Sequence, residues 1–133
     1  MKVLVDTSIW SLVLRRRKPD DENVKQKLIE LVQTDRAVVI GAVRQELLSG
    51  VRDKNDFERL RTRLREFRDW AVETDDYELA AEFFNRCRRS GVQGSFVDFL
   101  ICAMADRRKW SIFTSDNDFQ SFARFIPIKL LLV

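Results

Sequence analysis

The sequence contains no histidine and only two cysteines. Without histidine, a zinc site of the usual Cys/His type is not expected, and hydrolysis by a serine–histidine–acid triad is excluded. Cys87 and Cys102 both fall in segments with a helical pattern, and a secreted fold of this size usually carries a denser set of cysteines. We therefore expect two free thiols in a reducing compartment.

Long hydrophobic runs are also absent. The apolar stretches that could form buried strands, residues 3–5, 38–40 and 130–133, are far shorter than the roughly 20 residues of a membrane-spanning helix. The first such strand begins within two residues of Met1, which leaves no room for a signal peptide. We expect a cytoplasmic protein that makes no use of a membrane.

Charge of both signs is abundant. Hydrophobic residues make up 45% of the 133 residues and charged residues 34%, which is typical of a single globular domain. The net charge is +3, and arginine greatly outnumbers lysine. Because a guanidinium group both pairs with phosphate and stacks on bases, this bias favours a nucleic-acid partner. The run at residues 15–18 has no interleaved acids, so we expect it to contact phosphate.

Strand-like and helix-like segments alternate along the chain. Strands are predicted at residues 2–5, 37–40, 111–114 and near 126–132, with a weak candidate at 71–73. Helices are predicted at 7–14, from an N-cap at Asp20 through residue 32, and at 42–50, 55–70, 75–90, 96–108 and 116–122, with Asp75 and Glu78 in capping-box spacing. This order predicts an α/β fold: one mostly parallel sheet of four to five strands with helices on both faces.

Four acidic residues lie where such a sheet would bring them together. Asp6, Glu46, Asp98 and Asp116 each stand at the carboxyl end of a predicted strand or on a helix that follows one. Open α/β sheets bind ligands at that edge. Clustered carboxylates repel one another unless a cation neutralises them, and oxygen ligands alone favour Mg²⁺ or Mn²⁺. The pattern predicts a divalent metal site.

Each acid also has a simpler explanation. Asp6 could cap the first helix, and a Glu in the middle of a helix, such as Glu46, usually faces solvent. Ser95 and Asp98 have the spacing of a capping box. However, the helix that follows Asp98 is so apolar that it must be largely buried, and a carboxylate in its first turn then needs a cation or several donors to stay charged.

Hydroxyl groups and a further acid surround these positions. Thr7 and Ser8 follow Asp6 and could orient a carboxylate, as could Ser115 next to Asp116. Asp118 lies three residues after Ser115, so we interpret Asp118 as a helix cap with a possible supporting contact. Asp116 is then the fourth acid, although the sequence leaves the choice between Asp116 and Asp118 open.

The order and spacing of these motifs resemble the PIN-domain ribonucleases, and within them the VapC toxins of type II toxin–antitoxin modules. The resemblance is carried by VDTSIW, by a helix containing QELLSG, by a Gly and an Asp separated by six residues, and by TSDNDF, and it covers residues 1–133. One departure is the bulk of Phe96 and Phe99 around Asp98, which affects the expected width of the substrate channel.

The resemblance implies a metal-dependent endoribonuclease that leaves a 5′ phosphate and a 3′ hydroxyl. It implies that Asp6, Glu46, Asp98 and Asp116 hold Mg²⁺ or Mn²⁺. The implied partners are RNA, a small VapB-like antitoxin and a second copy of the chain. Candidate RNA-binding residues are Arg15, Arg16, Arg17 and Arg44.

Two other interpretations stay open. One is a catalytically inactive PIN fold that only binds RNA or serves in assembly. The other is a phospho-accepting receiver-like domain, which needs a Lys late in the sheet; Lys109 precedes its predicted strand, so this interpretation is disfavoured. The sequence does not indicate which RNA is cut or whether one or two metal ions bind.

Overall fold

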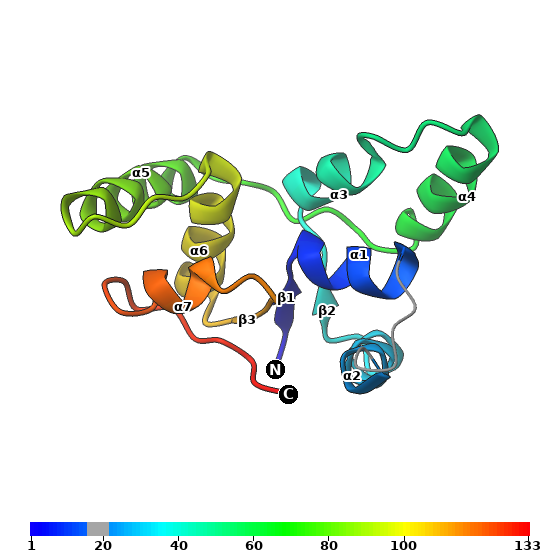
Figure 1. Cartoon of the computed structure of the whole chain (residues 1–133), viewed down its shortest axis with the longest axis horizontal. Coiled ribbons are helices and arrows are strands. Elements are labelled where there is room, and N and C mark those ends of the chain that lie inside the picture. Colours follow the sequence, from blue (N-terminus) through cyan, green and yellow to red (C-terminus); the bar gives the residue numbers. More distant parts are fainter. Residues whose placement is uncertain (16–21) are drawn as a thin grey trace.

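A short parallel sheet forms the centre of the structure, a computed structural model that describes residues 1–15 and 22–133 (Figure 1). Strand β1 (Val3–Val5) lies between β2 (Ala37–Val38) and β3 (Ser111–Phe113), in the order β2-β1-β3. Both pairings are parallel, as predicted. The prediction of four to five strands is wrong, because the described part of the chain has three.

The two other predicted strands do not form. Near the carboxyl terminus, Leu130 makes only an isolated parallel bridge to Ile112. Pro127, which lacks an N–H donor, interrupts this segment and disfavours a longer ladder. The segment at 71–73 leads instead into a helix, and Glu73 is that helix's N-cap.

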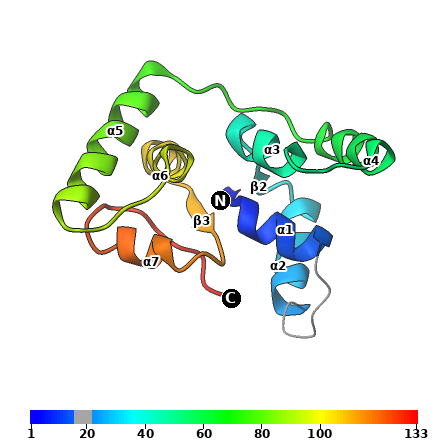
Figure 2. The same ribbon diagram turned by 45° about the horizontal axis from the view of Figure 1, so that its top comes forward.

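The helices form two groups around the central strand β1. In both views α5, α6 and α7 are on one side of β1, and α1 to α4 are on the other (Figures 1 and 2). Their bounds are α1 (Thr7–Arg15), α2 (Glu22–Gln33), α3 (Gly41–Leu48), α4 (Lys54–Leu64), α5 (Thr74–Arg89), α6 (Phe96–Arg108) and α7 (Asp118–Phe122). No helix in the described ranges is long and apolar enough to cross a bilayer.

Helix α4 is shorter than the predicted 55–70. Its end is fixed by Arg44 of α3, whose guanidinium donates to the carbonyl oxygens of Leu64 and Phe67, each at 2.7 Å. The same group donates to the carboxylate of Asp69 at 2.9 Å. These contacts hold the backbone beyond Leu64 in a turn, which the helical pattern of the sequence does not reveal.

Helix α6 is the most buried helix. Its inward side chains are Phe99, Ile101, Cys102, Ala103, Met104 and Ala105, and it packs mainly on α5. Cys87 of α5 and Cys102 are both free and buried. Burial, with smaller contributions from Asp98 and Cys87, raises the pKa of the Cys102 thiol well above its ordinary value. This thiol is therefore uncharged.

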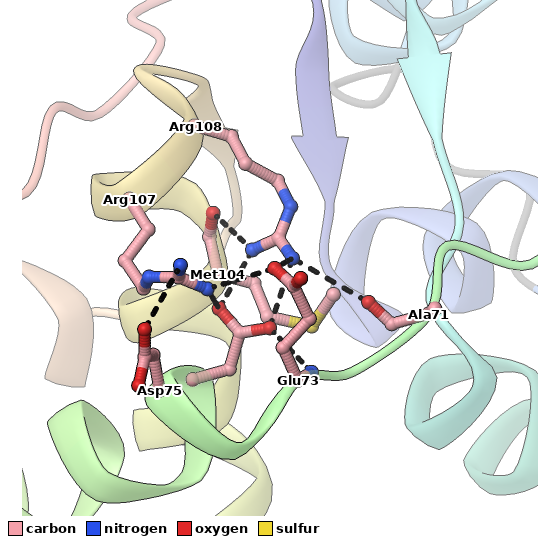
Figure 3. Close-up of polar contacts among 7 residues, drawn as sticks. Ala71, Glu73, Asp75, Met104, Arg107 and Arg108 are labelled. Carbon is pink, nitrogen blue, oxygen red and sulfur yellow. Dashed lines mark hydrogen bonds and ion pairs between the residues drawn. The ribbon is translucent and has the colours of Figure 1, made fainter.

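The start of α5 differs from the prediction. The expected capping box of Asp75 and Glu78 does not form; Asp76, fully buried, accepts a hydrogen bond from the backbone N–H of Glu73 at 2.8 Å. Arg107 and Arg108, at the end of α6, donate to the same carboxylate (Figure 3). This interaction fastens the first turn of α5 to the last turn of α6.

Two opposing effects act on the pKa of Asp76. Burial alone would raise it, but hydrogen bonds from Arg108, from the Glu73 N–H and from Arg107 outweigh burial and hold the pKa well below its ordinary value. Asp76 is therefore a buried carboxylate whose charge is fully compensated.

Candidate active site

Asp6 stands at the end of β1 and is 6% exposed. Its backbone N–H donates to the Phe113 carbonyl oxygen at 2.9 Å, which continues the β1–β3 pairing by one residue. Its Oδ2 atom accepts hydrogen bonds from Ser8 Oγ and Thr114 Oγ1, both at 2.8 Å. A hydroxyl from the first turn of α1 and a hydroxyl from the residue after β3 thus hold one carboxylate.

Asp98 lies in the first turn of α6. Its backbone N–H donates to Ser95 Oγ at 3.0 Å, and its Oδ2 accepts from the Ser95 N–H at 3.1 Å, so the predicted capping box is present. Burial raises the pKa of Asp98, and the negative charges of Asp6 and Asp116 raise it further, against lowering by the Ser95 hydrogen bonds. Asp6 and Asp116 are therefore close enough for their negative charges to act on Asp98.

Asp116 follows β3 and is tied to Asp6 through Thr114. The Asp116 N–H donates to Thr114 Oγ1 at 3.0 Å, and this hydroxyl in turn donates to Asp6. Asp116 Oδ1 accepts from the Asp118 N–H at 2.9 Å. The cap-like acceptor at the start of α7 is thus Asp116, and Asp118, which we interpreted as the cap, is exposed.

Glu46 is an exposed residue of α3. Its Oε1 accepts from Thr7 Oγ1 at 3.0 Å, across 39 residues of sequence. Since Thr7 directly follows Asp6, this contact brings the fourth predicted acid to the border of the other three.

The predicted hydroxyl groups contact different acids. Ser8 supports Asp6 directly, whereas Thr7 supports Glu46. Ser115 contributes its backbone N–H, which donates to Ser8 Oγ at 3.0 Å. The sequence analysis missed Thr114, which contacts both Asp6 and Asp116. Its signal was its place as the last residue of the predicted strand 111–114, directly opposite the residue after β1.

Known proteins share the sequence pattern and the fold of this chain. The PIN domain model matches residues 3–125. The chain belongs to the PIN domain family. Among curated proteins, no match is found.

Solved PIN structures share the whole fold of this chain. A chain of FitAcB from Neisseria gonorrhoeae is 19% identical with a TM-score of 0.77, over 98% of this chain and 96% of that one. A chain of VapBC2 from Rickettsia felis, bound to a promoter DNA fragment, is 16% identical with a TM-score of 0.79, over 98% of both chains. A chain of VapBC-5 from Mycobacterium tuberculosis is 18% identical with a TM-score of 0.70, over 100% of both chains.

The charges of this PIN domain site are uncompensated within the described residues. None of the four acids forms an ion pair with a described Lys or Arg. The donor set of carboxylate and hydroxyl oxygens suits a hard divalent cation, whose charge would relieve the repulsion. The chemistry of the site therefore fits Mg²⁺ or Mn²⁺.

The side chains do not form a direct coordination shell in this conformation. No group of three Asp, Glu, His or Cys side chains in the described ranges is close enough to hold an ion. Asp98 and Asp116 instead accept hydrogen bonds from the N–H groups of Ser95 and Asp118. Joint ligation of one ion would require these side chains to come closer together than they are in this conformation.

The predicted RNA contacts are described only in part. Arg16 and Arg17 lie outside the described residues, and Arg15 is described only as the last residue of α1. Arg44 has three structural contacts at the end of α4. Arg44 therefore has a role in the fold, and RNA binding by all four residues stays a prediction.

Proposed function

We propose that this PIN domain, residues 1–133, is a Mg²⁺- or Mn²⁺-dependent endoribonuclease and the toxin of a type II toxin–antitoxin pair. The observation that carries the proposal is that Thr114 links Asp6 and Asp116 at the ends of β1 and β3, and that neither these two acids nor Asp98 forms an ion pair with a described Lys or Arg. Burial raises the pKa of Asp98, and the charges of Asp6 and Asp116 raise it further. Such uncompensated charge at strand ends is typical of a ligand site rather than of a structural one.

The chain's own residues would position the acids. Ser8 and Thr114 fix Asp6, and Thr114 also holds the backbone at Asp116. The Ser95 capping box holds Asp98 at the amino end of α6. A divalent cation bound by Asp6, Asp98 and Asp116, with Glu46 at the border, would supply an activated water and stabilise charge on a phosphodiester. The expected products carry a 5′ phosphate and a 3′ hydroxyl.

The proposed partners are RNA, a small VapB-like antitoxin and a second copy of the chain, and the proposed location is the cytoplasm. Similar solved chains come from VapBC and FitAB assemblies, and one is titled a toxin–antitoxin complex from Klebsiella pneumoniae. That shared fold supports the antitoxin as partner.

RNA cleavage by the purified chain tests the activity. We expect cutting of mixed RNA with Mg²⁺ or Mn²⁺, no cutting with EDTA, and a loss of about a thousandfold in Asp6→Asn and Asp98→Asn, since a metal ion supplies several kcal/mol. Glu66→Gln, which changes an exposed acid outside the site, is the matched control and keeps full activity.

Binding of RNA without cutting under any metal condition would instead favour the inactive PIN module. Equal cleavage by wild type and Asp98→Asn, with contaminating nuclease excluded, would overturn the proposed site.

A further inference from the structure

A pocket of about 260 Å³ lies at the carboxyl end of α5, beside the loop that leads into α6. We call it the α5-end pocket; its walls are formed by Phe84, Arg88, Val92, Gln93, Gly94 and Phe99. Aromatic rings, a guanidinium group, a side-chain amide and a stretch of backbone therefore line one space. Proteins that bind single-stranded RNA use this mixture of groups, because bases stack on rings, phosphates pair with arginine and base edges bond to amides.

The antiparallel packing of α5 and α6 places this pocket beside the candidate active site. The first turn of α5 is paired with the last turn of α6 (Figure 3), and Phe84, near the end of α5, packs on Phe99 in the first turn of α6, with ring centroids 5.6 Å apart. Gly94 of the pocket is followed directly by Ser95, whose N–H donates to Asp98 at 3.1 Å. The pocket and the carboxylate of Asp98 thus share the amino end of α6.

The wall formed by Gly94 depends on the absence of a side chain there. A methyl group added to Gly94 would lie 2.5 Å from the ring of Phe122 and 3.0 Å from the ring of Phe99, and both rings are buried in the core. The loop backbone therefore lies directly against these rings, which fixes this wall of the pocket next to α6.

Two polar side chains of the pocket are left without a partner by the fold. Neither the Arg88 guanidinium nor the Gln93 amide forms an ion pair or hydrogen bond with any residue in 1–15 or 22–133, and both side chains are exposed. The dipole of α5 explains a basic residue near its carboxyl end, but not why that residue shares a pocket with a free amide. Both groups are available to a ligand.

We propose that the α5-end pocket binds one nucleotide of single-stranded RNA next to the phosphate that is cut, with Arg88 at a phosphate of that nucleotide and Gln93 at the edge of its base. The acids of the candidate site repel phosphate, so RNA needs a cation beside them, and Arg88 supplies one from the adjoining helix. An acidic peptide would pair with Arg88 but would make no use of the aromatic wall. The pocket therefore suits a nucleotide better than a peptide.

The inference rests on the proposed function in taking RNA as the substrate, and it adds a source of sequence preference at named residues. RNA binding is measured in EDTA, where the proposed enzyme does not cut. Loss of binding and loss of cleavage are therefore separate results.

Fluorescence anisotropy of a labelled single-stranded RNA of mixed sequence, titrated with the full chain in EDTA, tests the phosphate contact. We expect Arg88→Gln to raise the dissociation constant about tenfold, because a charge-assisted hydrogen bond is lost, and to reduce the slope of log K against log salt by about 0.7. Arg89→Gln removes the same charge from the next residue, which is exposed and outside the pocket. This matched control should change the dissociation constant at most about twofold.

Gln93→Ala tests the base contact. Among oligo(A), oligo(C) and oligo(U) of equal length, we expect the wild type to prefer one, and Gln93→Ala to reduce this preference about fivefold or more while leaving the salt dependence unchanged. Gln33→Ala, at an exposed amide of α2, is the matched control and keeps the preference. Circular dichroism and sedimentation velocity confirm that each variant keeps the wild-type fold and oligomeric state.

Three outcomes would overturn the proposal. The first is equal RNA affinity of wild type and Arg88→Gln, and the second is a base preference that Gln93→Ala leaves intact. The third is weaker binding of a poly-glutamate peptide by Arg88→Gln with unchanged RNA binding, which would assign the pocket to an acidic protein partner instead.

Discussion

Two carboxylates on neighbouring helices show opposite electrostatics. Asp76, in the first turn of α5, is fully buried, and hydrogen bonds from Arg108, from a backbone N–H and from Arg107 overcome the effect of burial and lower its pKa. Asp98, in the first turn of α6, has its pKa raised by burial and by Asp6 and Asp116. Both occupy the third position of a capping box, so local sequence position does not separate them.

The difference lies in what compensates the charge. Asp76 has all its partners inside the chain, and it needs no ligand to stay ionised. Asp98 has one backbone donor and two acidic neighbours. A carboxylate satisfied by the fold stabilises that fold, whereas one left short of positive charge is available to a cation from outside.

The largest expected effect on stability comes from removing the charge of Asp76, which Arg107 and Arg108 compensate. Asp76→Asn should lower the free energy of unfolding by about 3 to 5 kcal/mol at pH 7, because it removes the buried counter-charge of two partly buried guanidinium groups and leaves them only exposed carboxylates as partners. Urea denaturation measures the change. Asp75→Asn is the matched control: Asp75 is exposed and 3.6 Å from Arg107, so its loss should have little effect. Equal stability of wild type and Asp76→Asn would contradict the structural role.

The contribution of Asp76 to the free energy of unfolding should decrease in acid. Because folding lowers the pKa of Asp76, its stabilisation is present above the ordinary pKa of 3.8 and is lost progressively as pH falls from there toward the lowered pKa of the folded state. The stability gap between wild type and Asp76→Asn should therefore be constant from pH 7 to about 5 and narrow below about 4. Urea midpoints across this range measure the gap. A gap that widens in acid would contradict the lowered pKa.

Much of the fold followed from local patterns, and the errors share a cause. The Ser95–Asp98 capping box follows from residue spacing, and the parallel direction of the strands follows from the alternation of strands and helices along the chain. The ends of elements set by distant partners do not: Arg44 ends α4 from another helix, and Asp76 is buried by two arginines more than 30 residues away. Such contacts have no signal at short sequence range.

The residues of the candidate site also differ in how far local sequence indicates them. Asp6, Asp98 and Asp116 could be predicted as candidates because each marks the end of a strand or the start of a helix, and their role as metal ligands stays a prediction. Thr114 was missed because its value depends on the register that sets β3 beside β1. The interpretation of Asp118 as a cap failed because the neighbouring Asp116 accepts the N–H that Asp118 offers.

Addition of a divalent metal ion should stabilise the folded protein through the site at Asp98, where the fold leaves the carboxylate charge uncompensated. A cation at a hundred times its dissociation constant stabilises the folded state by about 2.7 kcal/mol. We expect Mn²⁺ or Mg²⁺ to raise the urea midpoint of the wild type and EDTA to reverse the shift. The shift should persist in Asp75→Asn and shrink in Asp98→Asn. An equal shift in Asp98→Asn would place the ion elsewhere.

Thr114→Val tests whether the hydroxyl, rather than the volume, of this side chain organises the acids. The substitution removes the donor to Asp6 Oδ2 and the acceptor for the Asp116 N–H while nearly keeping the shape. Loss of such an orienting group typically lowers metal affinity or activity about 10- to 100-fold. Metal titration and RNA cleavage measure the loss, Thr114→Ser should recover most of it, and Thr62→Val, at an exposed hydroxyl of α4, should leave both readouts unchanged. Because Thr114 joins the ends of two strands, wild-type values in Thr114→Val would mean that Ser8 alone suffices to orient Asp6.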